Sequence, residues 1–152
     1  MTSKEKVLKR ERDRGRMAAL EIQERSPGMT GTELYAADDR IPRFKAAVEK
    51  MNMLDRHAGR TDGLVCKSTA GRVVRLIQNY DSTIFTAEPE ELPAQWGFVW
   101  SQDPAKALPF VAISTSPYMT GDCCTEGGNV YRSKIDNNIW APRGYPQGWE
   151  GR

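Results

Sequence analysis

The chain has 152 residues, and its 22 lysines and arginines against 20 acidic residues give a formal net charge of +2. This length suits one domain or two very small modules on a helical stem. No apolar run approaches the roughly 20 residues that span a bilayer, and the charged N-terminus lacks the apolar segment of a secretory signal peptide. We therefore expect a protein that does not enter a membrane and is made in the cytoplasm.

The residues that usually carry chemistry are sparse. Cys66, Cys123 and Cys124 leave an odd thiol and two of them are adjacent, which argues against a disulfide framework. With His57 as the single histidine and no Cys-x-x-Cys spacing, we expect neither a metal site nor a cofactor. The acidic run at 88–91 contains a proline and is interpreted as a solvated loop rather than a catalytic carboxylate pair. The sequence therefore predicts a protein that is not an enzyme.

Residues 2–25 are predicted to form a helix, because Thr2 can cap it and Glu5 stands at the capping-box position. Its first half is highly charged and its apolar face is thin, so the isolated helix would be marginal in water. We interpret residues 4–16 as a solvated or oligomer-packed surface rather than a nucleic-acid-binding arm, because acidic residues dilute the positive field. These acidic residues are Glu5, Glu11 and Asp13.

Two further helices are expected before residue 60. A second capping box, Thr30 to Glu33, predicts a short helix, and Pro42 suits the first turn of the next one. The apolar residues of that helix follow i, i+3, i+4, i+7 spacing and are Phe44, Ala47, Val48 and Met51. Short β-type runs punctuated by Gly, Pro, Asn and Asp follow, so residues 1–59 are assigned to a helical N-terminal assembly segment.

An internal repeat organises the remaining sequence. Each copy predicts a hairpin with a glycine turn, followed by an irregular loop that ends in Pro-x-x-Trp. The first copy comprises 63–66, 71–75 and 93–96, and the second comprises 121–124, 128–132 and 146–149. The predicted fold is therefore α+β: a helical segment followed by two small all-β, three-stranded, Trp-anchored modules at 60–113 and 114–152.

Aromatic residues are expected to fill these small cores. We assign Trp96 and Trp149 as core anchors because each closes its repeat at the same place, and Tyr131 as a further structural anchor. Trp140 and Tyr145 lie in a loop where core packing and ligand contact remain equal alternatives. The apolar stretch 96–113 is interpreted as a central strand pair that locks the copies together, through Phe110, Val111 and Ile113. For Trp100, the core and a subunit contact both remain open.

The second copy resembles a known family. Its Tyr-Met-Thr-Gly-Asp at 118–122, Gly-Asn-Val-Tyr-Arg-Ser at 128–133, Trp-Ala-Pro at 140–142 and Tyr-Pro-Gln-Gly-Trp at 145–149 resemble small chitin-binding-type carbohydrate-binding modules. The pattern is also similar to C-terminal modules of bacteriophage tail and baseplate-region proteins, in which paired copies follow a helical segment. The resemblance covers about residues 116–150.

The sequence departs from that family at several positions. Lys134, Ile135 and Asp136 follow the Tyr131 strand, where the sugar-binding family usually carries exposed aromatics. The first copy has Leu64 where the second has Asp122, and Val74 where the second has Tyr131. We therefore expect the first copy to be structural only.

The resemblance implies an accessory virion protein of the phage tail or baseplate region. The helical N-terminus would anchor it to other virion proteins, with homo-oligomer formation expected, while the β modules face outward for host-surface contact or assembly. A bacterial cell-surface glycan would be contacted by Trp140, Tyr145, Asp136, Asn137 and Asn138. The alternative is a free cell-wall glycan-binding module, and a third possibility is a nucleic-acid binder that uses residues 4–16.

Overall fold

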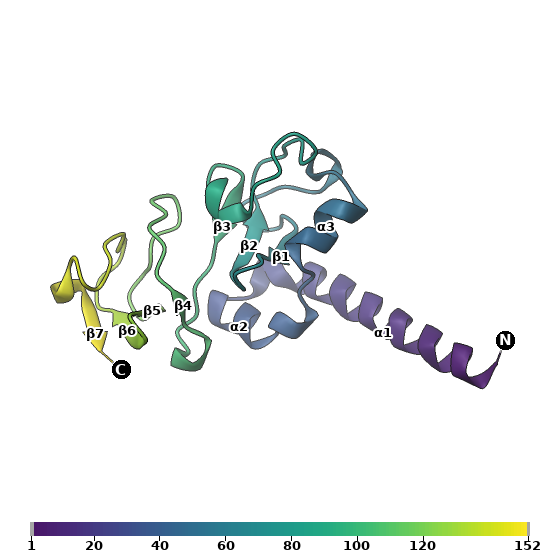
Figure 1. The fold of residues 1–152 in the computed structure, drawn as a ribbon, viewed down its shortest axis with the longest axis horizontal. Coiled ribbons are helices and arrows are strands. Elements are labelled where there is room, and N and C mark those ends of the chain that lie inside the picture. Colours follow the sequence, from purple (N-terminus) through teal and green to yellow (C-terminus); the bar gives the residue numbers. More distant parts are fainter. Residues whose placement is uncertain (1, 152) are drawn as a thin grey trace.

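Two small β-sheets follow a helical N-terminal segment in the computed structural model, which describes residues 2–151 apart from the side chains at positions 8, 11–13 and 15. Figure 1 shows helix α1 projecting from the body, with the N-terminus at its far end and the C-terminus on the opposite side. The predicted α+β class is confirmed.

Helix α1, Ser3–Arg25, begins at the predicted capping box. The Thr2 hydroxyl accepts a hydrogen bond from the Glu5 backbone N–H, and the Glu5 carboxylate accepts one from the Thr2 N–H. The described side chains of its first half are exposed, and Ile22 is buried near its end. The expected mixing of charges also involved Glu11 and Asp13, which lie outside the described side chains.

The second predicted capping box is also confirmed, at helix α2, Gly31–Ala36. The Thr30 hydroxyl accepts from the Glu33 N–H, and the Glu33 carboxylate accepts from the Thr30 N–H. Both boxes are local devices that satisfy backbone donors at a helix start, which explains why sequence alone located them.

Helix α3, Phe44–Lys50, buries Phe44 and Ala47 as expected. The assignment of Met51 to the same apolar face is wrong. Met51 is extended, with φ −158° and ψ 140°, and its side chain is 43% exposed. The helix ends one residue earlier, so the helical spacing no longer determines the direction of this side chain.

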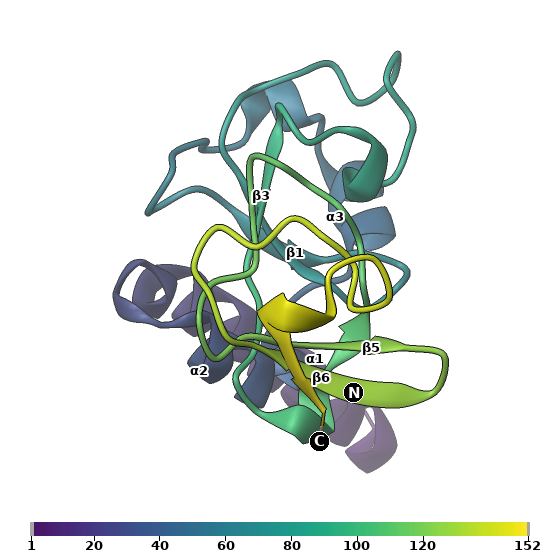
Figure 2. The ribbon, with the colours of Figure 1, turned by 90° about the vertical axis from the view of Figure 1, so that its left-hand side faces the viewer.

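Two sheets follow these helices. The first has the order β1-β2-β3 and is antiparallel throughout; its strands are Val65–Lys67, Val73–Leu76 and Trp96–Phe98. The second has the order β4-β5-β6-β7; its strands are Leu108–Pro109, Cys123–Glu126, Asn129–Ser133 and Trp149–Gly151. Strand β4 runs parallel to β5, and the other pairs are antiparallel. The view in Figure 2 places β5 and β6 in front of α1.

The two sheets share one pairing register. The pairs in the first sheet are Cys66 with Val74 and Leu76 with Trp96, and the pairs in the second are Cys124 with Tyr131 and Ser133 with Trp149. Residues that are equivalent in the internal repeat therefore occupy equivalent pairing positions in β1-β2-β3 and in β5-β6-β7. In each, the closing tryptophan is the first residue of the third strand.

The segment that joins the sheets differs from expectation. Strand β3 lies at an edge of its sheet, and only residues 108–109 of the following stretch form a strand, also at an edge. The predicted central strand pair is therefore wrong. Pro109 has no N–H to continue the pairing, and edge strands are where proline is tolerated. Phe110 and Val111 are nevertheless packed against the core, and Ile113 is buried in it.

Aromatic rings connect the two sheets. Trp96 and Trp149 are buried, at 0% and 5% exposure, and Tyr131 packs partly buried against the same cluster. Trp100 stacks on Tyr118, with ring centroids 4.2 Å apart and planes 11° from parallel. Trp100 therefore belongs to the core. The cluster also includes Phe44, so it draws on all three ranges that the sequence divided at 60 and 114.

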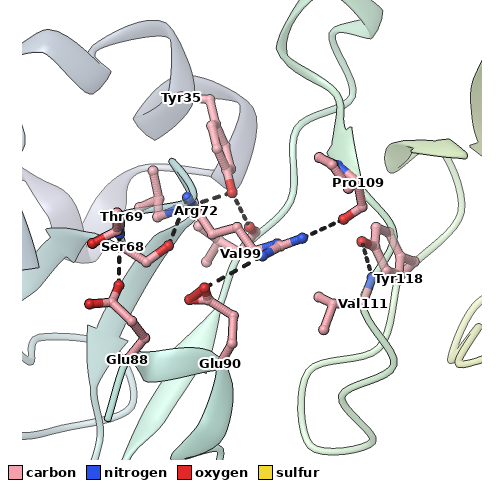
Figure 3. A network of polar contacts seen from close by, with 11 residues as sticks. Tyr35, Ser68, Thr69, Arg72, Glu88, Glu90, Val99, Pro109, Val111 and Tyr118 are labelled. Carbon is pink, nitrogen blue, oxygen red and sulfur yellow. Dashed lines mark hydrogen bonds and ion pairs between the residues drawn. The ribbon is translucent and has the colours of Figure 1, made fainter. Parts of the chain in front are cut away.

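A polar network crosses the junction near strand β2 (Figure 3). Arg72 is buried, and its guanidinium donates to the Pro109 carbonyl at 2.6 Å and to the Glu90 carboxylate at 3.4 Å. Glu88 accepts a hydrogen bond from the Thr69 N–H at 2.8 Å. The interpretation of the 88–91 run as a solvated loop is therefore wrong, because buried Arg72 draws the Glu90 carboxylate inward.

Tyr35 closes the same network from helix α2. Its hydroxyl donates to the Val99 carbonyl at 2.9 Å and accepts from the Val73 N–H at 3.1 Å, as Figure 3 shows. The hydroxyl therefore satisfies two backbone groups at the end of the β2–β3 ladder. Burial raises the pKa of Tyr35 to about 12.

We predict that Tyr35→Phe lowers the free energy of unfolding by about 1–3 kcal/mol, because it leaves the buried Val73 N–H without an acceptor. Between pH 10 and 12 the unfolded tyrosine ionises and the buried one does not, so the wild type loses stability as pH rises through this range. The variant should lose less, by up to about 1.4 kcal/mol per pH unit. Urea denaturation across this range measures both effects, with Tyr145→Phe as the surface control.

Candidate functional site

The residues that the structure describes contain no cluster suited to metal binding. No group of three or more His, Cys, Asp or Glu among them is arranged to hold a metal ion, and no described helix is long and apolar enough to cross a membrane. All three cysteines are buried and unpaired. Burial raises the pKa of the Cys66 thiol, and that of Cys124 to about 12, so both are protonated near neutral pH and poor nucleophiles.

Two aromatic rings stand out on the surface of the second sheet. Trp140 is 50% exposed and Tyr145 is 36% exposed, and both lie in the loop between β6 and β7. Their ring centroids are 5.4 Å apart with planes tilted by 55°. The sequence left burial and exposure open for these residues, and the structure places both rings at the surface and in contact.

The backbone of Trp140 is held from both sides. Its N–H donates to the Asn138 side-chain oxygen at 3.3 Å, and its carbonyl accepts from the Trp149 indole N–H at 2.8 Å. Trp149 is thus a core anchor that also supports the exposed ring. These contacts order the loop without a ligand.

Asn138, expected at the contact surface, is fully buried, and this expectation is corrected. Its side-chain amide donates to the Ser133 hydroxyl at 3.0 Å and to the Gly148 carbonyl at 3.1 Å. Its backbone also pairs in both directions with Tyr118. Asn138 therefore ties together the two ends of the loop, and its polar atoms are used internally.

Tyr145 is positioned by a glycine. A Cβ at Gly148 would lie 2.7 Å from the Tyr145 ring and 3.1 Å from the Asn138 side-chain nitrogen, so the ring packs where only glycine fits. Arg143, two residues before Tyr145, donates its backbone N–H to the Glu126 carboxylate of β5 at 2.8 Å. The loop is therefore attached to the hairpin beside it.

Asp136 and Asn137 are exposed but bond to a different part of the chain. The Asp136 carboxylate accepts from the Thr120 N–H at 3.0 Å, and this bond lowers the pKa of Asp136. Asn137 adopts a left-handed φ of 55°, and its N–H points to the Met119 sulfur. Both residues thus fasten the start of the loop to the turn at 118–122. Of the five predicted contact residues, only Trp140 and Tyr145 bring exposed aromatic rings together at the surface.

A polar cleft lies between the same loop and the β5–β6 hairpin. Its volume is about 480 Å³, and its lining includes Glu126, Asn129, Tyr131 and Arg143. Sequence reasoning missed it because the hairpin and the loop are distant along the chain. The one signal was the Gly127-Gly128 turn, whose two positive φ angles bring Glu126 and Asn129 together as a pair.

Comparison of the chain with protein families, curated proteins and solved structures found no match. The site is therefore defined by its geometry and by the sequence pattern alone.

We predict that Asn138→Ala destabilises the protein by about 1–3 kcal/mol, because it removes a buried donor and acceptor that join the loop ends. Asn137→Gly should be neutral or stabilising, because glycine adopts the left-handed φ of 55° without a steric cost. Urea denaturation of both variants tests this contrast between neighbouring asparagines. Equal stability of Asn138→Ala and wild type would contradict the assigned structural role.

Proposed function

We propose that this protein is a non-catalytic binding protein that contacts a cell-surface glycan through Trp140 and Tyr145. The observation that carries the proposal is the exposed ring pair on a loop whose backbone is already fixed. An aromatic face packs against the apolar C–H face of a pyranose, and an ordered loop loses little conformational freedom on binding.

The loop that carries the two rings also lines the polar cleft, although neither ring is part of the lining. The cleft offers the Glu126 carboxylate, the Asn129 amide and the Arg143 guanidinium, which can hydrogen-bond sugar hydroxyls. The 55° tilt between the two rings presents an angled surface rather than a flat strip. We therefore infer contact with one or two sugar residues or a chain end, in preference to the flat face of a crystalline polysaccharide.

The setting that we propose is a bacteriophage particle, in the tail or baseplate region. The resemblance of residues 116–150 to modules of such proteins supports this, as does the placement of the start of α1 and of the loop between β6 and β7 (the Trp140 loop, residues 134–148) toward opposite ends of the molecule (Figure 1). One end could then be held by other virion proteins or by copies of the chain while the other faces outward. A free cell-wall glycan-binding protein is the second candidate, because it would use the same aromatic site.

We predict that Trp140→Ala and Tyr145→Ala each weaken retention on peptidoglycan or on bead-linked chitin oligosaccharides by at least about fivefold, the cost of losing a central aromatic contact of about 1 kcal/mol. Phe85→Ala is the matched control, because Phe85 is also an exposed aromatic residue, 56% exposed, and lies on a different loop. Pull-down assays measure retention, and thermal denaturation verifies folding.

The same assays separate the contact ring from the core ring. Trp149→Ala should cost about 3–5 kcal/mol of stability, because the side chain is buried in the aromatic cluster. Trp140→Ala should remain folded. If it unfolds, Trp140 has a structural role; if it folds and binds every tested glycan as wild type does, the glycan proposal is wrong.

The particle setting has its own test. A mass-spectrometric inventory of purified particles from a phage that encodes the chain should contain it at a stoichiometry that repeats between preparations. Absence from washed particles would remove the virion role and favour the free glycan-binding protein. That outcome would leave the prediction for Trp140 intact.

A further inference from the structure

An open groove separates helix α1 from helix α3. It has a volume of about 320 Å³, and its apolar lining includes Ala19 and Leu20 of α1, Ala46 of α3, and Pro42. Leu20 is 65% exposed beside it. Residues 16, 19, 20 and 23 follow helical spacing, so one face of α1 forms a wall of the groove.

Both walls of this groove are fixed to the first sheet. The Gln23 side chain donates to the Val65 carbonyl at 2.7 Å and accepts from the Val65 N–H at 2.8 Å. On the other side, the Lys67 N–H donates to the Pro42 carbonyl at 2.9 Å, just before α3. The groove is therefore formed in the free protein and needs no rearrangement to receive a ligand.

The charged residues known to line the groove, among the side chains that the structure describes, all carry the same sign. They are Arg16, Lys50 and Arg56, and none of the described lining side chains is acidic. The Arg56 Nε atom is buried and has no hydrogen-bond acceptor among the described residues. The groove therefore combines an apolar floor with cations that lack carboxylates, which favours an occupant that is apolar on one face and acidic at its margins.

This charge pattern also discriminates between occupants. The first half of α1 carries seven cations against three acidic residues, so in a second copy it would bring a net positive charge against a cationic rim, which is unfavourable. Nucleic acid would satisfy the cations and leave the apolar floor, including Leu20, without a partner. An acidic amphipathic segment satisfies both.

We propose that the α1–α3 groove docks an acidic amphipathic segment of another protein, with apolar residues at i, i+3, i+4 spacing seated on Leu20 and Ala46. This inference rests on the proposed anchoring role of the helical segment and specifies the chemistry of its partner. It is independent of the glycan site at the other end of the molecule.

The test is selection of a random 16-residue peptide display library on the immobilised full chain. Enriched peptides should combine Asp or Glu with apolar residues at helical spacing. As soluble peptides they should bind the Arg16→Glu/Lys50→Glu double variant at least about tenfold more weakly than wild type, because two attractive pairs become repulsive. The matched control is Lys4→Glu/Lys6→Glu, which makes the same charge change on α1 outside the groove and should leave binding unchanged.

Three outcomes would overturn the proposal: no enrichment over the bare support, enrichment of peptides without acidic residues, and equal binding to both double variants. A different result would be displacement of the selected peptides by duplex DNA, with the Arg16→Glu/Lys50→Glu variant weakening DNA binding as well. That result would also overturn the proposal and identify a nucleic-acid-binding surface. Failure here is distinguishable from failure of the anchoring role. If the chain is absent from particles but its groove still selects acidic peptides, only the virion setting is refuted. If the chain is present in particles but its groove selects no such peptides, only the groove proposal is refuted.

Discussion

The stacking of Trp100 on Tyr118 is the contact on which the two halves of the molecule depend. Phe98 of β3 stacks on the other side of Trp100 at 5.8 Å, and Trp149 of β7 meets Tyr118 edge-on at 5.4 Å. One column of rings therefore fills the space between the sheets. A three-stranded module of about 35 residues buries too little apolar surface to be stable alone. Sharing the column solves this problem for both sheets, and the bond from Arg72 to the Pro109 carbonyl adds a polar link across the same junction.

The contacts that join the two sheets are long-range, whereas the features that the sequence predicted correctly are mostly local. The capping boxes at Thr2 and Thr30 involve residues three apart, and each hairpin follows from the glycine turn between its two strands, so these are local signals. The place of the closing tryptophan in each copy follows from the internal repeat. The errors concern long-range partners. Glu90 turns inward because Arg72, 18 residues earlier in the chain, is buried beside it, and nothing in the acidic run itself indicates this.

In the candidate site, too, some features were predictable from the sequence and others depend on long-range contacts. An aromatic loop was predictable from composition, and the core position of Trp149 from the repeat. The exposure of Trp140 depends on Asn138, whose polar side chain suggested a surface position although it is the buried tie of the loop. Polar residues are usually exposed, and a buried one such as Asn138 needs hydrogen-bond partners that only the assembled chain reveals. The cleft that includes Glu126 and Arg143 was invisible for the same reason.

The ring column also has a mechanical consequence. In a molecule held at α1 and loaded at the Trp140 loop, tension crosses the junction between the sheets, where stacked rings and the Arg72–Pro109 bond act side by side. A gap of about 0.5–1 Å costs a dispersion contact roughly a quarter to a half of its attraction, and a donor–acceptor pair stretched to about 3.6 Å is no longer a hydrogen bond. Such a junction is stiff and brittle rather than elastic. It would transmit force with little deformation until the two sheets separate in one step. The segment between β3 and β5 would then remain as the covalent link between them.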